Sequence, residues 1–281
     1  MQASSWTLIY DLAEHLTGQI YTPQQKDGLL RNNYRRRFRQ LGFERPEEYL
    51  TYLHENEDEW SQFISLSTIH TTSWFREEPH FQFLRRQLET CAPNLRGPFR
   101  VLVAACSTGQ EAYSLGLLLE EFRFTHPTFD YRIEAFDIDP VSVMAAERAV
   151  YRRNGFPEPY WAKYKRMLLE GRNRAEGFFS FSPEIRKRMM FRVGDICDLP
   201  KFDDGFDWIM CRNVLIYFDM ERVPAIARGL AGHLRAGGQL CIGHSESFDA
   251  HSVGLRLITN SIYSPIDGKD KTPVSAPGPA P

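Results

Sequence analysis

The segment FRVLVAACSTGQEAYSLGLLLEEF, residues 99–122, changes character at a single glycine. Before Gly109 it is a short apolar run, and beyond Gly109 the apolar residues continue over the length of a helix. A strand followed by a helix that opens on small polar residues is typical of the first unit of an open α/β sheet, in which ligands bind at the carboxyl ends of the strands. The segment therefore predicts such a sheet, with a ligand site at the turn around Gly109.

This turn lacks the signatures of phosphate binding. A Walker loop needs a second glycine followed by a lysine, and a dinucleotide fingerprint needs G-x-G-x-x-G, whereas Gly109 stands alone. Glu111 also places a carboxylate at the helix start, where free N–H groups would otherwise attract an anion. The turn therefore favours a cationic ligand.

The composition excludes several classes of protein. With 281 residues, 42% of them apolar and 25% charged, the chain is long enough for one large and one small domain. A net charge of -2 gives no general reason to expect nucleic acid. Because no long apolar run and no basic leader occur, we expect a cytoplasmic protein without membrane insertion. The five cysteines form no C-x-x-C pair, which favours buried thiols in a reducing compartment and no metal site.

The character of the chain changes near residue 99. Residues 1–68 carry apolar positions at helical spacing and predict three to five short helices, and residues 81–92 predict another. Beyond them, strand-like runs alternate with helical stretches, which predicts a parallel sheet with helices on both faces. The predicted strands lie in 99–106, 131–139, 189–195, 206–213 and 237–245, and the predicted helices near 110–122, 141–150 and 219–235.

Two segments depart from this alternation. The Tyr- and Arg-rich stretch 151–188 is longer than a single connection needs, and GFFSFS at 177–182 predicts an edge strand of a small insertion near 160–183. Residues 268–281 are rich in Pro and Ala, so we expect a disordered tail. Its linker-like composition suggests a further C-terminal domain in the full-length protein.

Asp137 and Asp139 close the second predicted strand. An acid at this place in nucleoside-binding α/β proteins accepts hydrogen bonds from ribose hydroxyls, and Asp137 is the candidate. Alternatively, both aspartates cap the helix that starts at Pro140, a role that suits Asp139 better. The residues alone leave both interpretations of Asp137 open.

Several motifs taken together are more specific. TTSWFR (71–76), AACSTGQEAYS (104–114), AFDID (135–139), FDWIMCRNVLIYFD (206–219) and GGQLCIGHSES (237–247) occur in this order. In order and approximate spacing they resemble the CheR family, the chemoreceptor glutamate methyltransferases, and the resemblance extends to about Ser264. It implies an α/β fold with the Rossmann-like sheet of class I S-adenosylmethionine-dependent methyltransferases. The implied parts are a receptor-facing all-helical domain at 1–72, a linker and helix at 73–98, and a cofactor-binding domain at 99–267 that contains the small β insertion.

The resemblance also implies the reaction. S-adenosylmethionine is the methyl donor, S-adenosylhomocysteine the product, and a glutamate side chain in the cytoplasmic helical domain of a chemoreceptor the acceptor, for signalling adaptation in chemotaxis. The donor carries a sulfonium and an ammonium but no phosphate, in agreement with the turn at Gly109. By resemblance, Glu111 holds the amino group and Asp137 the ribose. The family's cofactor contacts fall on His70, Thr72, Arg76, Glu111, Asp137, Asp195, Ile196, Arg212 and Asn213. His70 and Asp195 stand where the family has Asn, and Gln110 where Glu is more common.

The catalytic residues implied by the family are Arg76 and Tyr217. An unperturbed glutamate is already ionised near neutral pH, so no general base is required. Positioning then carries most of the catalysis and can lower a barrier by ~7 to 11 kcal/mol. A guanidinium can hold the acceptor carboxylate while a tyrosine hydroxyl helps to orient it. The alternatives are a surface ion pair of Arg76 with Glu77 or Glu78 and a half-buried core tyrosine at 217.

The basic stretch 31–39 is a separate signal. Leu30, Tyr34, Phe38 and Leu41 share one helical face, so the arginines are expected to point outward. Such a row is suited to attract the acidic methylation helix of a receptor, although charge runs are usually solvated faces. The predicted receptor contacts are Arg35, Arg36 and Arg39.

Three points remain: the insertion, the HSES motif and the rival functions. The family's β insertion, which in some members binds a receptor pentapeptide, corresponds to about 165–181. HSES at 244–247 is interpreted as structural, because a hydrolase motif such as G-x-S-x-G is absent.

The rival functions are a methyltransferase acting on RNA or a small molecule, and an adaptor that binds the donor without reacting. Missing base-stacking patterns argue against RNA, and Arg76 with Tyr217 argues against the adaptor.

Overall fold

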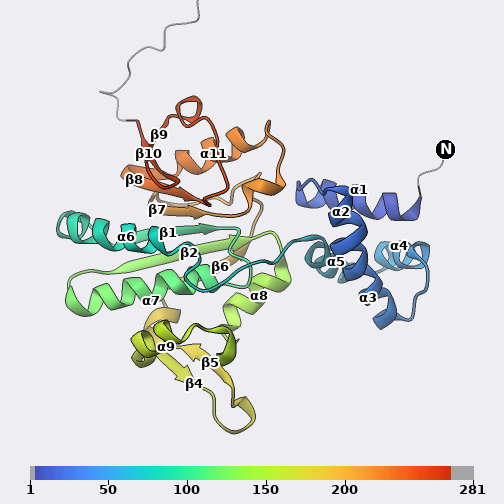
Figure 1. Cartoon of the computed structure of the whole chain (residues 1–281), viewed down its shortest axis with the longest axis horizontal. Helices are drawn as coiled ribbons and strands as arrows, with labels where there is room; N and C mark the ends of the chain where they lie inside the picture. Colours follow the sequence, from blue (N-terminus) through green and yellow to red (C-terminus); the bar gives the residue numbers. More distant parts are fainter. Residues whose placement is uncertain (1–3, 267–281) are drawn as a thin grey trace, which may run out of the picture.

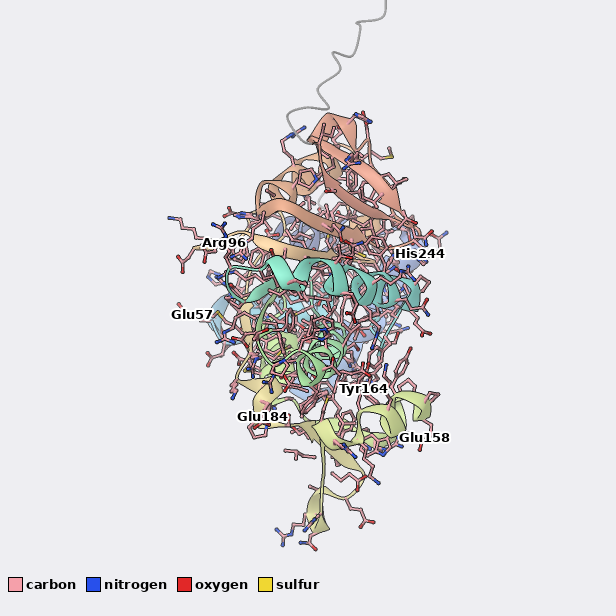
Figure 2. The ribbon with its side chains drawn as sticks, turned by 90° about the vertical axis from the view of Figure 1, so that its left-hand side faces the viewer. Glu57, Arg96, Glu158, Tyr164, Glu184 and His244 are labelled. Atoms are coloured by element: carbon pink, nitrogen blue, oxygen red, sulfur yellow. The ribbon has the colours of Figure 1, made fainter. Side chains whose placement is uncertain are left out.

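The computed structural model describes residues 4–266, so the predicted tail at 268–281 lies outside the described residues. Figure 1 shows three parts: a group of helices from the first 67 residues, a large sheet with flanking helices, and a small sheet that projects from one end of it. Figure 2, turned by 90°, shows the same small sheet at the lower end of the molecule. No helix among the described residues is long and apolar enough to span a bilayer.

The first part contains five α-helices, as predicted. They are α1 (Ser5–Thr17), α2 (Pro23–Gln25), α3 (Arg31–Leu41), α4 (Pro46–Glu55) and α5 (Glu59–Ser67), with a π-helical turn at Lys26–Leu30. Gly18 ends α1 with φ 68°, a left-handed conformation that favours glycine. The helices bury a core of their own that includes Ile9, Tyr34, Tyr49 and Phe63.

The large sheet has the strand order β6-β2-β1-β7-β8-β10-β9. Its strands are β1 (Phe99–Ala104), β2 (Tyr131–Asp137), β6 (Met189–Val193), β7 (Phe206–Cys211), β8 (Leu234–Ile242), β9 (Leu255–Thr259) and β10 (Ile262–Pro265). Central β1 pairs in parallel with β2 and β7, with Val101 opposite both Ile133 and Trp208. The prediction of a parallel sheet is correct for the strands from β6 to β8, whereas β10 and β9, for which no strand was predicted, pair antiparallel.

Helices cover both faces of this sheet, as the alternation predicts. They are α6 (Glu78–Cys91), α7 (Gln110–Thr125), α8 (Pro140–Arg148) and α11 (Val223–Gly232). Val101 and Val103 of β1 belong to the core formed with α6 and α7, whereas Leu102 and Ala104 point into the core formed with α11. The strand thus presents alternate side chains to two cores.

The insertion is a three-stranded antiparallel sheet of order β3-β5-β4. It consists of β3 (Tyr151–Arg152), α9 (Glu158–Tyr164), β4 (Leu168–Glu170) and β5 (Phe178–Phe181), and α10 (Pro183–Arg186) follows. The predicted edge strand in GFFSFS is therefore the central strand, because β3 pairs along its other side. Trp74 packs against Phe179 and Phe181 of β5, which ties the insertion to the segment before α6.

The cysteines follow the prediction only in part. Cys106, Cys211 and Cys241 are buried, Cys91 is half-buried and Cys197 is exposed. Although the residue is exposed, partial burial of its thiol and the nearby Asp195 carboxylate raise the pKa of Cys197 to about 11. The three buried thiols pack in the two cores of the sheet.

Candidate functional site

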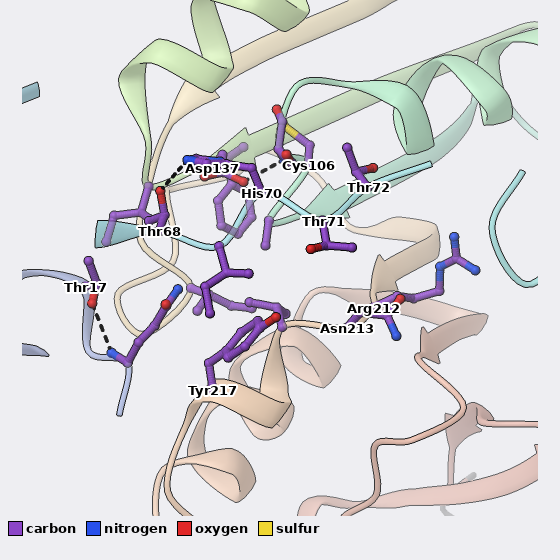
Figure 3. A pocket seen from close by; sticks show the side chains of 18 of the residues that line it. Thr17, Thr68, His70, Thr71, Thr72, Cys106, Asp137, Arg212, Asn213 and Tyr217 are labelled. Carbon is purple, nitrogen blue, oxygen red and sulfur yellow. Dashed lines mark hydrogen bonds between the residues drawn. The ribbon is translucent and has the colours of Figure 1, made fainter. Parts of the chain in front are cut away.

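A cleft lies over the carboxyl ends of β1, β2, β6 and β7. All predicted cofactor residues and both predicted catalytic residues line it. Figure 3 shows that its side chains come from the helical part, from the segment before α6 and from the turns after the strands: Thr17, Thr68, His70, Thr72, Asp137, Asn213 and Tyr217.

The turn around Gly109 forms one wall of the cleft. Gly109 has φ 93°, and a Cβ there would lie 2.8 Å from both the Ala146 Cβ and the Tyr151 hydroxyl. Only glycine therefore allows the start of α7 to pack this closely on α8. Ser107 adopts φ 49°, and its buried hydroxyl has no partner among the described residues.

Asp137 joins the ends of β1 and β2. Its carboxylate accepts hydrogen bonds from the backbone N–H of Ser107 at 2.7 Å and of Asp139 at 3.0 Å. Burial raises the pKa of Asp137, while these two bonds act to lower it. Asp139 instead caps α8 by accepting the N–H groups of Val141 and Ser142. The capping interpretation is therefore correct for Asp139 and wrong for Asp137.

Glu111 is paired with Arg212, whose side chain is fully buried. The Arg212 Nε and Nη2 donate to Glu111 Oε2 at 2.8 and 2.5 Å, and its Nη1 donates to the Arg76 carbonyl at 2.6 Å. Glu111 Oε1 has no hydrogen-bond partner among the described residues. The pair therefore fixes the Glu111 side chain and leaves one oxygen available at the cleft.

Glu77 and His80 also contact the Arg212 guanidinium. Its Nη1 lies 3.5 Å from Glu77 Oε2 and 3.2 Å from His80 Nδ1, and His80 Nε2 donates to the Asn260 carbonyl at 2.8 Å. Burial lowers the pKa of His80 to about 4, so it is neutral near pH 7 and accepts from Arg212. Glu77, His80 and His244 each offer one atom that could bind a metal ion, and these three atoms lie within 4.8 Å of one another. The adjacent Arg212 guanidinium would repel a metal ion there.

The motif HSES is structural, as interpreted from the sequence. Glu246 is buried and its carboxylate accepts the N–H groups of Asn213, Leu215 and Gly243 at 2.6–2.8 Å. These bonds hold the loop after β7, which carries Asn213 and Tyr217 into the cleft.

Arg76 and Tyr217 are among the least engaged side chains in the cleft. Arg76 Nη1 donates to the Thr71 carbonyl at 3.1 Å, and Glu77 bonds Asn213 and Arg212 instead of Arg76. The predicted alternative of a surface ion pair is therefore not formed. Burial raises the pKa of the Tyr217 hydroxyl, and the nearby Arg76 guanidinium counteracts this, which is consistent with the two facing one space.

The other predicted cofactor residues differ in how firmly they are held. His70 Nε2 lies 2.8 Å from the Ser65 carbonyl, and its Nδ1 lies 3.2 Å from the Ser142 hydroxyl, so the ring links α5 to α8. Asp195 accepts the N–H of Cys197 at 2.8 Å. Ile196 is buried beside it.

Sequence reasoning missed the contribution of the first helix. Thr17 and Gln19, at the end of α1, also line the cleft, more than fifty residues before the first predicted contact. No periodicity or motif marks them, and Gly18 between them is the one local signal, since it turns the chain there. Ser107 and Glu77 were also missed, although both lie within or beside predicted motifs.

The arginines of α3 do not all point outward. Arg35, Arg36 and Arg39 are exposed, but Arg37 Nε donates to the buried Glu59 carboxylate at 2.9 Å, which corrects the prediction for that residue. Arg36 lines a groove between α3 and α5 that adjoins the cleft, because residues 68–71 line both.

Comparison with known proteins gives consistent matches. The family "CheR methyltransferase, SAM binding domain" matches residues 70–263, and "CheR methyltransferase, all-alpha domain" matches 9–67. Chemotaxis protein methyltransferase 2 of Pseudomonas aeruginosa is 33% identical over 260 residues, 89% of each chain. The chemotaxis protein methyltransferase of Salmonella typhimurium is 32% identical over 256 residues, 90% of this chain and 84% of the relative. The S-adenosylmethionine-bound amino pentose methyltransferase CalS10 of Micromonospora echinaspora is 15% identical, with a TM-score of 0.34 over 60% of this chain and 51% of that chain.

Proposed function

This chain belongs to the CheR methyltransferase family, and from that membership we propose how its cleft carries out the reaction. The protein transfers a methyl group from S-adenosylmethionine to glutamate side chains of chemoreceptor cytoplasmic domains. The observation that supports the site is that every predicted cofactor contact and both predicted catalytic residues line one cleft at the carboxyl ends of the strands. When bound, S-adenosylmethionine supplies a methyl group on positively charged sulfur, and transfer to a carboxylate oxygen gives an ester and neutral S-adenosylhomocysteine without moving a proton.

The polar groups of the cleft fit a positively charged nucleoside without phosphate. Glu111 Oε1 and the Asp137 carboxylate are available as acceptors, the Ser107 hydroxyl lacks a partner among the described residues, and the lining contains no lysine. We assign Glu111 to the amino group and Asp137 to the ribose hydroxyls. The other proposed cofactor contacts are His70, Thr72, Arg76, Asp195, Ile196 and Asn213. Arg212 acts through Glu111, because its nitrogens already face protein acceptors.

Arg76 and Tyr217 position the acceptor. A glutamate carboxylate is ionised near neutral pH, so the site needs to hold one oxygen in line rather than to remove a proton. The Arg76 guanidinium supplies two parallel donors to that carboxylate, and the Tyr217 hydroxyl fixes its orientation. The Tyr217 hydroxyl is a neutral donor near pH 7, and burial raises its pKa further from that range.

The setting of the reaction follows from its substrate. We propose that the protein works in the cytoplasm, where the acceptor domain lies, and that it takes no nucleic acid, since the chain carries a net charge of -2. The exposed Arg35, Arg36 and Arg39 form the receptor-facing surface. The composition of residues 268–281 supports a linker to a further domain.

Incubation with labelled S-adenosylmethionine and receptor cytoplasmic domains tests this function. Alkali-labile methyl esters on receptor glutamates are expected. Label found only in RNA, or tight donor binding that never yields S-adenosylhomocysteine with any receptor offered, would contradict the proposal.

Glu111→Gln is expected to weaken binding of S-adenosylhomocysteine by about tenfold or more, the usual effect of removing the charge from a charge-assisted hydrogen bond. Glutamine keeps an oxygen that can accept from Arg212, so the fold should persist. Calorimetry measures the dissociation constant, and Glu147→Gln on exposed α8 serves as the control. Equal affinities for the two variants would remove Glu111 from the site.

Arg36→Glu is expected to slow receptor methylation by about tenfold at low salt, because reversing a charge at the rim of an interface slows association. The defect should shrink as ionic strength rises. Initial rates at two salt concentrations measure it. Arg256→Glu, on exposed β9, is the matched charge reversal. If both variants behave alike, the arginine surface is merely solvated.

A further inference from the structure

The side-chain oxygen of Gln19 is buried in the wall of the cleft without a partner. The residue is 6% exposed and lines the cleft. Its Oε1 is shielded from solvent and has no hydrogen-bond partner among the described residues. A buried amide oxygen left without a partner costs free energy, so this group indicates a ligand that completes it.

The backbone around Gln19 is firmly held. The Gln19 N–H donates to the Thr17 hydroxyl at 3.3 Å, and the next N–H, of Ile20, donates to the Tyr217 carbonyl at 2.8 Å. The Gly18 carbonyl accepts from Arg222 Nη1 at 3.0 Å. The amide is therefore presented to the cleft by a fixed segment of chain, as a binding group should be.

The neighbours of this segment identify the end of the cleft that Gln19 faces. A Cβ on Gly18 would lie 3.3 Å from the Phe218 ring and 3.4 Å from the Cys197 sulfur, so the segment crosses the loops after β7 and β6. In the sheet order β6-β2-β1, the proposed amino-group contact Glu111 follows β1 and the proposed ribose contact Asp137 follows β2. In S-adenosylmethionine the ribose lies between the amino-acid part and the adenine base. With the amino group at β1 and the ribose at β2, the base therefore lies toward β6, beside Ile196.

We propose that Gln19 recognises the amino edge of the adenine ring, with Oε1 accepting from the 6-amino group and Nε2 donating to the adjacent ring nitrogen. An amide offers one acceptor and one donor in the plane that this edge of adenine requires. The inference rests on the proposed cofactor site. It makes the helical part of the protein a contributor to base specificity, besides its proposed contact with the receptor.

A comparison of two ligands and two proteins tests this pairing. The ligands are S-adenosylhomocysteine and its analogue with hydrogen in place of the 6-amino group, and the proteins are the wild type and Gln19→Met, which fills similar space without hydrogen-bonding groups. Calorimetry gives four dissociation constants, and thermal melts without ligand show that both proteins are folded. The wild type should prefer the amino compound by about tenfold, and Gln19→Met should bind both ligands alike.

Each other outcome has a separate meaning. If Gln19→Met weakens both ligands by the same factor, or changes neither, Gln19 only packs and the inference fails. If the wild type binds neither ligand, the proposed cofactor site itself fails. Gln19→Glu, which keeps the acceptor but loses the donor, should retain part of the preference for the amino compound.

Discussion

Replacing Arg76 with alanine is expected to lower the rate of methyl transfer by about a hundredfold to a thousandfold, the effect of removing one preorganised donor from an active site. The affinity for S-adenosylhomocysteine should fall much less, because Arg76 is only one of the proposed cofactor contacts. Alanine retains the backbone carbonyl that accepts from Arg212, and the lost side chain gives up one bond, to the Thr71 carbonyl. The fold and the wall around Glu111 should therefore survive the substitution.

Single-turnover rates with a receptor domain and calorimetry with the product separate these effects. Arg76→Lys keeps the charge without the paired donors and should fall between the wild type and alanine. Arg148→Ala, on the exposed side of α8, is the control. A normal rate in Arg76→Ala, or a loss of product affinity as large as that of Glu111→Gln, would contradict the assignment.

Arg212→Met is expected to destabilise the protein by about 3 to 5 kcal/mol, the cost of breaking a buried ion pair by removing one partner. The substitution leaves the Glu111 and Glu77 carboxylates, each 14% exposed, without their shared counter-charge. It also frees the Arg76 carbonyl and His80 Nδ1. Urea unfolding measures the loss, and cofactor affinity should fall with it because Glu111 is no longer held.

Arg132→Met is the matched control for this effect. Arg132 pairs with Asp130 at the surface, with side chains 50% and 41% exposed, and such pairs contribute at most about 1 kcal/mol. If Arg212→Met were no more destabilising than Arg132→Met, the buried network would not support the site.

Local patterns predicted much of this architecture. The turn at Gly109, the alternating apolar runs from Phe99 onward and the cap at Asp139 are each encoded within a few residues, and the structure forms all three. The hairpin of β9 and β10 escaped prediction because its strands are short and because Leu257 and Ile258 of β9 are exposed although they are apolar, so the sequence shows no clear alternation of buried and exposed positions. The central place of β5 depends on its partner β3, a two-residue strand with no signal of its own.

Contacts between distant segments account for the rest. Arg37 looked like one more exposed arginine of a basic row, yet Glu59, 22 residues later, draws it inward. The motif predicted that Arg212 lies in the cleft. It did not predict the hydrogen bonds of Arg212 to Glu111, which join residues 101 positions apart. Helical periodicity carries no information about such pairs.

The hydrogen bond from Ile20 to the Tyr217 carbonyl ties the end of the first helix to the loop that carries the proposed catalytic tyrosine. Exchanging the first 67 residues for those of a relative would therefore do more than redirect the enzyme to another receptor. Such chimaeras would carry a foreign segment in place of Thr17 and Gln19 at the cleft, and their turnover would measure how well the exchanged helices fit the loop after β7.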